Sequence, residues 1–177
     1  MKTDRGFGKS TQIAAAAVFA SLVFVITYAI PPISIPATSG YFNVGETAIY
    51  ISALIFGSFV GALSGGIGAA IADALLAPQF AVGTLIIKGV EGAIVGFLPA
   101  KLHRVIPNRS VAATLAIIAG GLEMVLGYFL YEQLVLGYPL AVALVEVPFN
   151  LVQMTVGLAI AIPVVHAVRQ VMPQLKS

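Results

Sequence analysis

The residues best suited to chemistry in this 177-residue chain are polar side chains that interrupt long apolar stretches. Lys88 and Glu91 are about one helical turn apart, and Thr84 precedes Lys88 by one turn, so a helix would place all three on one face. An ionisable group near the centre of a bilayer costs on the order of 3 kcal/mol, and it therefore needs a partner or a wet cavity. Two interpretations follow for Lys88 and Glu91: a binding site, or an ion pair that holds helices together.

Two further apolar stretches carry polar residues of the same kind. Glu146, Asn150 and Gln153 share a helical face, while Glu123 lies in a separate stretch with Tyr128 nearer its outer end. Counting about 1.5 Å of rise per residue from the outer ends of these stretches places the ionisable groups roughly 10–18 Å deep. Polar faces of three helices at one height predict a pocket that opens outward.

The elements that must position these residues are membrane-spanning helices. Hydrophobic residues make up 59% of the chain and charged residues only 9%, whereas a soluble domain carries about a quarter charged residues. There is no charged side chain from Ser10 to Phe42 or from Thr47 to Ala72, and uncharged apolar runs longer than about 18 residues are typical of membrane spans. A net charge of +2 without a basic stripe argues against nucleic acid as a partner.

Neither catalysis nor metal binding is indicated. Cysteine is absent, which excludes a thiolate metal site and a cysteine nucleophile. We therefore expect no catalytic residue, no metal and no cofactor. An intramembrane enzyme that uses Glu91 and Glu123 is a minor alternative.

Charge asymmetry sets the number of spans. Eight of the nine basic residues lie near the amino terminus, between 101 and 109, or near the carboxyl end, which predicts that these three places are cytoplasmic. The stretch 43–77 must then cross twice, with a bend near Gly57 and Ser58, and the stretch 110–168 turns at Gly137 to Pro139. The prediction is a single all-α membrane domain over residues 1–177, with both termini cytoplasmic and six spans at about 11–30, 43–56, 59–77, 81–100, 110–135 and 140–168.

The proline-rich loop 31–42 could cover the pocket as a lid, or it could be a plain connector. We expect Glu46 and Asp73 to lie near the outer membrane surface, where solvated carboxylates are common. Glycines recur every four residues at Gly57, Gly61 and Gly65, a spacing that predicts close helix packing.

Several motifs together resemble the S components of energy-coupling factor (ECF) transporters. They are Asn43-Val44-Gly45-Glu46, the glycine-rich run 53–68 followed by Ala72-Asp73, the block 83–92 with Lys88-Gly89-Val90-Glu91-Gly92, and Pro148-Phe149-Asn150-Leu151-Val152-Gln153. The resemblance covers nearly the whole chain, although Ser58 stands where many members have proline. It is closest to the riboflavin-type and hydroxymethylpyrimidine-type group.

The resemblance implies a function in the cell membrane. The chain would be a multi-pass subunit, not itself an ATPase, that captures a water-soluble vitamin or precursor such as riboflavin, pyridoxine or hydroxymethylpyrimidine outside. It would work with a transmembrane coupling subunit and two ATPase subunits, and Ala16 and Ala20 of the first helix would dock on the coupling subunit. The candidate substrate-binding residues are Tyr41, Asn43, Thr84, Lys88, Glu91, Glu123, Tyr128, Glu146, Asn150 and Gln153.

A competing hypothesis is a small channel or helix-packing subunit that lacks a high-affinity ligand. A channel needs polar residues along its whole bore, but the inner part of the last span, Leu158 to Val165, is apolar. The sequence therefore favours a pocket closed at its inner end.

Overall fold

Helices dominate residues 8–30 and 32–172, the part of the chain that the computed structural model describes. Lys2, Arg5 and Lys176 of the charge argument, and Pro31 of the loop, lie outside the described residues. The elements in chain order are α1 (Lys9–Ala29), β1 (Ile33–Ile35), β2 (Gly40–Phe42), α2 (Glu46–Phe56), α3 (Ser58–Leu76), α4 (Ala81–Leu102), α5 (Arg109–Leu134) and α6 (Leu140–Val171).

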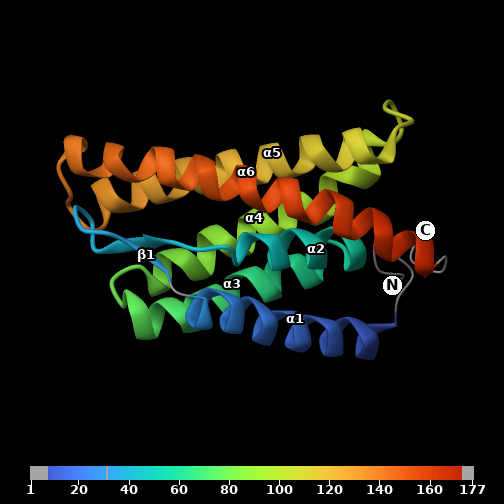
Figure 1. Cartoon of the computed structure of the whole chain (residues 1–177), viewed down its shortest axis with the longest axis horizontal. Helices are drawn as coiled ribbons and strands as arrows, with labels where there is room; N and C mark the ends of the chain where they lie inside the picture. Colours follow the sequence, from blue (N-terminus) through green and yellow to red (C-terminus); the bar gives the residue numbers. More distant parts are fainter. Residues whose placement is uncertain (1–7, 31, 173–177) are drawn as a thin grey trace.

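The helices form one bundle in which successive helices run in opposite directions (Figure 1). This confirms the predicted all-α membrane bundle of six helices. The start of α1 and the end of α6 lie at the same end of the bundle, and the β1–β2 hairpin lies at the other (Figure 1). Which end faces the cytoplasm is still a prediction from the charge distribution.

The chain reverses direction between α2 and α3 within a single residue. Gly57 has φ +94°, a left-handed backbone conformation that favours glycine, and its N–H donates to the carbonyl of Ala53 at 2.9 Å. The bend predicted near Gly57 and Ser58 therefore lies at this glycine.

Helices α3 and α4 approach each other through glycines. A Cβ atom at Gly61 would lie 2.4 Å from the carbonyl oxygen of Gly92, and one at Gly92 would lie 2.2 Å from the carbonyl oxygen of Gly61. Even an alanine at either position would force the backbones apart. The small-residue spacing thus allows the contact on which the α3–α4 pair is built.

Helix α2 differs from its prediction because it starts at Glu46, not at 43. With 11 residues it rises only about 16 Å, too short to cross a bilayer alone, whereas the other five helices are long and apolar enough. The preceding residues 43–45 are irregular and lie among the helices, where their polar groups are satisfied. The N–H of Asn43 donates to the Gln153 side chain at 3.0 Å, and that of Gly45 donates to the Asn43 side chain at 2.8 Å.

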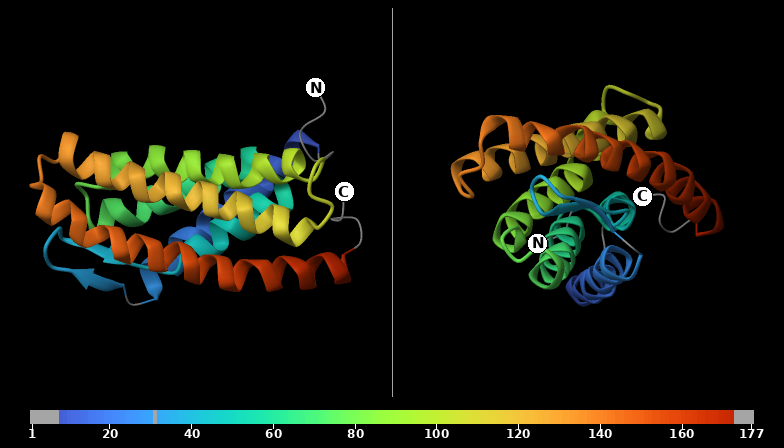
Figure 2. Two further views of the ribbon diagram at one scale, coloured as in Figure 1. Left: turned by 90° about the horizontal axis from the view of Figure 1, so that it is seen from above. Right: turned by 60° about the vertical axis from the view of Figure 1, so that its left-hand side comes forward.

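The hairpin pairs β1 with β2 in antiparallel register, with Ile33 opposite Phe42 and Ile35 opposite Gly40. Figure 2 (right) shows it across the middle of its end of the bundle, between α6 and the α3–α4 pair. Toward the other end the interior is apolar, with a core that includes Val23, Leu54, Ile117, Ala161 and Val165. The space for polar chemistry therefore lies beneath the hairpin.

Candidate functional site

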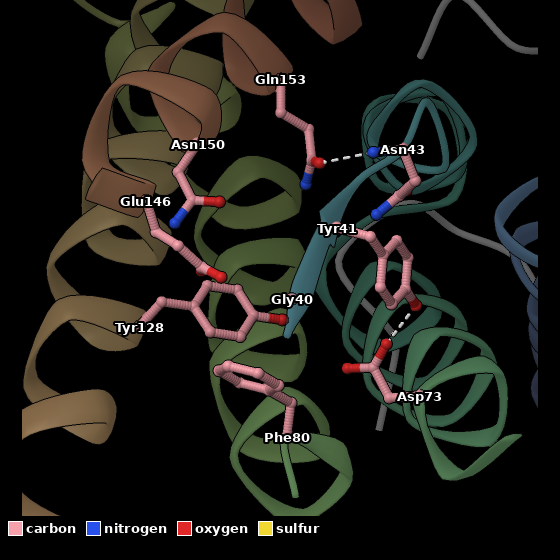
Figure 3. A pocket seen from close by; sticks show the side chains of 9 residues that line it. All are labelled: Gly40, Tyr41, Asn43, Asp73, Phe80, Tyr128, Glu146, Asn150 and Gln153. Carbon is pink, nitrogen blue, oxygen red and sulfur yellow. Dashed lines mark hydrogen bonds between the residues drawn. The ribbon is translucent and has the colours of Figure 1, made fainter. Parts of the chain in front are cut away.

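A small cavity lies where β2 meets the hairpin-side halves of the long helices. Its volume is about 30 Å³, enough for a water molecule or two. It is lined by residues of β2 and the segment after it, of α3, α5 and α6, and of the turn before α4: Gly40, Tyr41, Asn43, Asp73, Phe80, Tyr128, Glu146, Asn150 and Gln153 (Figure 3). The lining is polar and mostly buried.

Asp73 of α3 organises one side of the cavity. Its two carboxylate oxygens accept hydrogen bonds from the hydroxyls of Tyr41 and Thr84. The Thr84 hydroxyl also lies 2.8 Å from the hydroxyl of Tyr128. The Tyr41 phenol is the donor in its bond to Asp73, because an ionised carboxylate can only accept. This chain of bonds ties the hairpin to α3, α4 and α5.

Glu146 of α6 organises the opposite side. Its Oε1 atom accepts a hydrogen bond from the Thr38 hydroxyl in the turn of the hairpin, and the Thr38 carbonyl accepts from the Tyr138 hydroxyl at 3.0 Å. A Cβ atom at Gly40 would lie only 2.0 Å from the same Oε1 atom. Gly40 therefore allows the hairpin to seat against α6.

A second polar network lies directly behind the cavity. Lys88 of α4 donates to Glu46 of α2 and, at 3.2 Å, to Glu91 on its own helix. Glu91 also accepts from the Tyr50 hydroxyl at 2.8 Å. Gln153 joins this network to the cavity, since its Nε2 donates to Glu46 at 2.8 Å.

The structure brings most of the predicted binding residues together. Tyr41, Asn43, Tyr128, Glu146, Asn150 and Gln153 line the cavity. Thr84, Lys88 and Glu91 lie behind this lining and make the bonds described above. Glu123 does not line the cavity; it is half-buried, and one of its carboxylate oxygens is buried without a hydrogen-bond partner among the described residues. Whether these residues contact a substrate is still a prediction.

The interpretation of Glu46 and Asp73 as solvated carboxylates was wrong. Glu46 is 1% exposed and Asp73 6% exposed, and each accepts hydrogen bonds inside the bundle. The extended chain before α2 accounts for the depth of Glu46, because the hairpin occupies the outer part of that crossing. Asp73 is buried because the hairpin lies over it and Tyr41 reaches its carboxylate.

Sequence reasoning also missed two uncharged lining residues, Gly40 and Phe80. Gly40 adjoins the predicted Tyr41, and its lack of a side chain was the available signal. Phe80 follows Pro78 in the turn between α3 and α4, and nothing in its local sequence separates it from an ordinary core residue.

The two proposed docking residues on α1 line the same apolar groove between α1 and α3, together with Ala17, Ser21 and Ile67. Ala20 is half-buried, whereas Ala16 is only 4% exposed and lies at the base of the groove. The groove has a volume of about 430 Å³. Docking through this face is still a prediction.

The chain is a helical membrane protein with a polar cavity beneath a hairpin. Residues 8–170 match the family "ECF-type riboflavin transporter, S component", and the chain belongs to this family. It is thus a subunit of a vitamin-uptake system in the plasma membrane.

One relative is similar over most of both chains. A Pyrococcus woesei protein described as "Uncharacterized protein in gap 3'region" is 38% identical over 135 residues, which cover 76% of this chain and 86% of the relative.

Proposed function

We propose that this subunit binds one water-soluble vitamin or vitamin precursor in the cavity beneath the hairpin. The substrate is a small heterocycle with several hydrogen-bond donors and acceptors, of the riboflavin, pyridoxine or hydroxymethylpyrimidine kind. A purely apolar ligand would leave the polar lining unpaired, at a cost of about 1–3 kcal/mol for each group.

The observation that carries the proposal is the convergence of side chains from several elements on one buried cavity. Polar groups on β2, α3, α5 and α6 meet there, although they are far apart in the sequence (Figure 3). Asn150 is 8% exposed, and its side chain makes no hydrogen bond with any described residue. The amide borders the cavity, where a ligand or water can complete its hydrogen bonds.

Substrate capture and release require the hairpin to move. The cavity holds a water molecule or two, so no vitamin fits until β2 is displaced. The hairpin is a lid in this proposal. Release on the cytoplasmic side then depends on a transmembrane coupling subunit and two ATPase subunits, since the proposal assigns no ATP hydrolysis to this chain.

The competing hypotheses fit the interior less well. A channel would need polar groups throughout, but the interior toward the start of α1 is the apolar core. An intramembrane enzyme based on Glu91 would need this carboxylate to reach the cavity, but Glu91 is fully buried behind it and bonded to Lys88 and Tyr50.

The test has two parts. Mass spectrometry of small molecules released from the purified protein should identify a vitamin or precursor, and calorimetry with that compound should give a single site. Replacing Asn150 with Ala should lower affinity roughly 5- to 150-fold, because a bond worth about 1–3 kcal/mol is lost.

Thr155→Ala is the matched control for this substitution. Thr155 is exposed on the same helix and donates only to the carbonyl of Leu151 at 2.8 Å. Its replacement should leave affinity unchanged. Equal affinity of the Asn150→Ala variant and the parent would reject the cavity as the binding site.

A further inference from the structure

The charged residues that line the cavity are both acidic. Asp73 and Glu146 line it from opposite sides of the Gly40 end of β2 (Figure 3). Among the described lining residues there is no Lys, Arg or His. The nearest cation, Lys88, is already shared between Glu46 and Glu91 in the network behind.

The lining carboxylates accept hydrogen bonds from neutral hydroxyls: Asp73 from Tyr41 and Thr84, and Glu146 from Thr38. The fully buried carboxyl of Glu132 on α5 lies beside Glu146 and adds a further acidic group there. A cation that also donates hydrogen bonds compensates the negative charge of a buried carboxylate, which a neutral hydroxyl does not. The described residues place no such cation at the cavity, so a cationic ligand would complete it.

Asn150 gives a second, independent indication of a ligand. Its neighbour Gln153 is fully engaged, since its oxygen accepts from the backbone of Asn43 and its nitrogen donates to Glu46. The Asn150 side chain, by contrast, makes no hydrogen bond with any described residue and points toward the cavity (Figure 3). A ligand that meets it can use both a donor and an acceptor.

We infer that the substrate carries a positively charged nitrogen, held between Asp73 and Glu146, on a single heterocyclic ring whose polar substituents meet Asn150. This inference rests on the proposed function and selects among its candidate substrates. It disfavours neutral flavins and anionic phosphate esters. A three-ring flavin would also require a much larger displacement of β2 than a single ring does.

A matched set of ligands tests the charge directly. Pyridoxamine and pyridoxine share one ring and differ in an aminomethyl group, cationic at neutral pH, against a neutral hydroxymethyl group. Pyridoxal 5'-phosphate supplies an anion, and riboflavin supplies a neutral flavin. Affinities for the full-length, detergent-purified protein, freed of co-purified ligand, are measured by calorimetry. We expect pyridoxamine to bind at least roughly tenfold more tightly than pyridoxine.

Variants show whether the preference arises in the cavity. Asp73→Asn keeps the shape of the side chain and should lower the pyridoxamine-to-pyridoxine affinity ratio at least roughly tenfold. Glu146→Gln is a second variant with the same expectation, for use if the first does not fold. An unchanged ratio in a folded variant would overturn the inference.

The remaining outcomes separate this inference from the proposed function. If riboflavin, pyridoxine or pyridoxal 5'-phosphate binds most tightly, the cationic substrate is rejected while the vitamin-binding function stands. If no probe binds, the co-purified small molecule decides: a compound with a basic nitrogen supports the inference, and a compound without one overturns it. The absence of any bound small molecule would reject the proposed function itself, and the inference with it.

Discussion

Replacing Lys88 with Met should destabilise the protein at least as much as breaking a buried ion pair does. Lys88 is buried and donates to both Glu46 and Glu91, so the substitution leaves two buried carboxylates without their cation. Removing one partner of a buried pair costs about 3–5 kcal/mol. Because a protein of this length loses about 2–4 °C in Tm per kcal/mol, we expect Tm to fall by about 6–20 °C.

The rescue experiment tests whether Lys88 stabilises one buried carboxylate, Glu91, or two, Glu91 and Glu46. Sequence reasoning considered only Lys88 and Glu91, and on that basis Lys88→Met with Glu91→Gln should restore stability. The structure adds Glu46, which the double variant leaves uncompensated. Full recovery should therefore require Glu46→Gln as well. Both new amides keep an oxygen that can accept the existing bonds from Gln153 and Tyr50.

Thermal unfolding in detergent at about pH 8, where carboxylates are normally ionised, is the assay. The chain contains no Trp and no Cys, so the loss of helical circular dichroism is the suitable signal. Lys101→Met is the control: this lysine lies exposed near the end of the same helix, its ammonium 4.5 Å from the centre of the Phe97 ring. A Tm for Lys88→Met as high as that of the control would refute the structural role. Complete recovery in the double variant would refute the coupling to Glu46.

Three further predictions concern topology, docking and the lid. Cysteines introduced at Ser39 and Pro139 should react with a membrane-impermeant reagent from outside and one at Asn108 should not; labelling of Asn108 from outside would contradict the predicted orientation. Ala20→Trp fills the groove between α1 and α3 and should abolish uptake with the coupling module while ligand binding by the isolated subunit persists; unimpaired uptake would reject Ala20 as a docking residue. Gly40→Ala places a Cβ 2.0 Å from a carboxylate oxygen of Glu146, which must turn away and lose its bond to Thr38, so ligand should dissociate roughly 2- to 12-fold faster in stopped-flow measurements, as expected for about 0.5–1.5 kcal/mol. Ser39→Gly is its control, because Ser39 already has φ 57° and glycine relieves strain there; equal rates for the two variants would refute the seating role of Gly40.

The helices could be predicted because lipid imposes strong rules on sequence. A crossing needs a long uncharged stretch, and basic residues gather on one side. Together these rules divided the ambiguous 43–77 stretch at the glycine where the chain turns. The polar face of α4 and the polar face of α6 could also be predicted, because helical spacing fixes which residues of a helix are neighbours.

The sequence could not reveal how deep the chain runs before α2. Depth was counted on the assumption that a crossing is helical throughout, whereas residues 40–45 are extended or irregular and lie among the helices. Non-helical backbone is tolerated there only because side chains of other elements form hydrogen bonds with its polar groups. These side chains are far away in the sequence. Glu46 was misplaced for this reason, and Asp73 was misplaced because the hairpin covers it. No local pattern distinguishes a carboxylate covered by a hairpin from one that faces water.

The bonds that close the lid use the same acceptors that a ligand needs. The Thr38 hydroxyl donates to Glu146, the Tyr41 hydroxyl donates to Asp73, and the backbone N–H of Asn43 donates to Gln153. Each such bond contributes about 0.5–1.5 kcal/mol net, so opening the empty lid is unfavourable unless a ligand replaces what is lost. A ligand is therefore selected by what it adds beyond the hydroxyls it competes with. A cation adds charge to the carboxylates, while Asn150 offers a bond for which the lid does not compete.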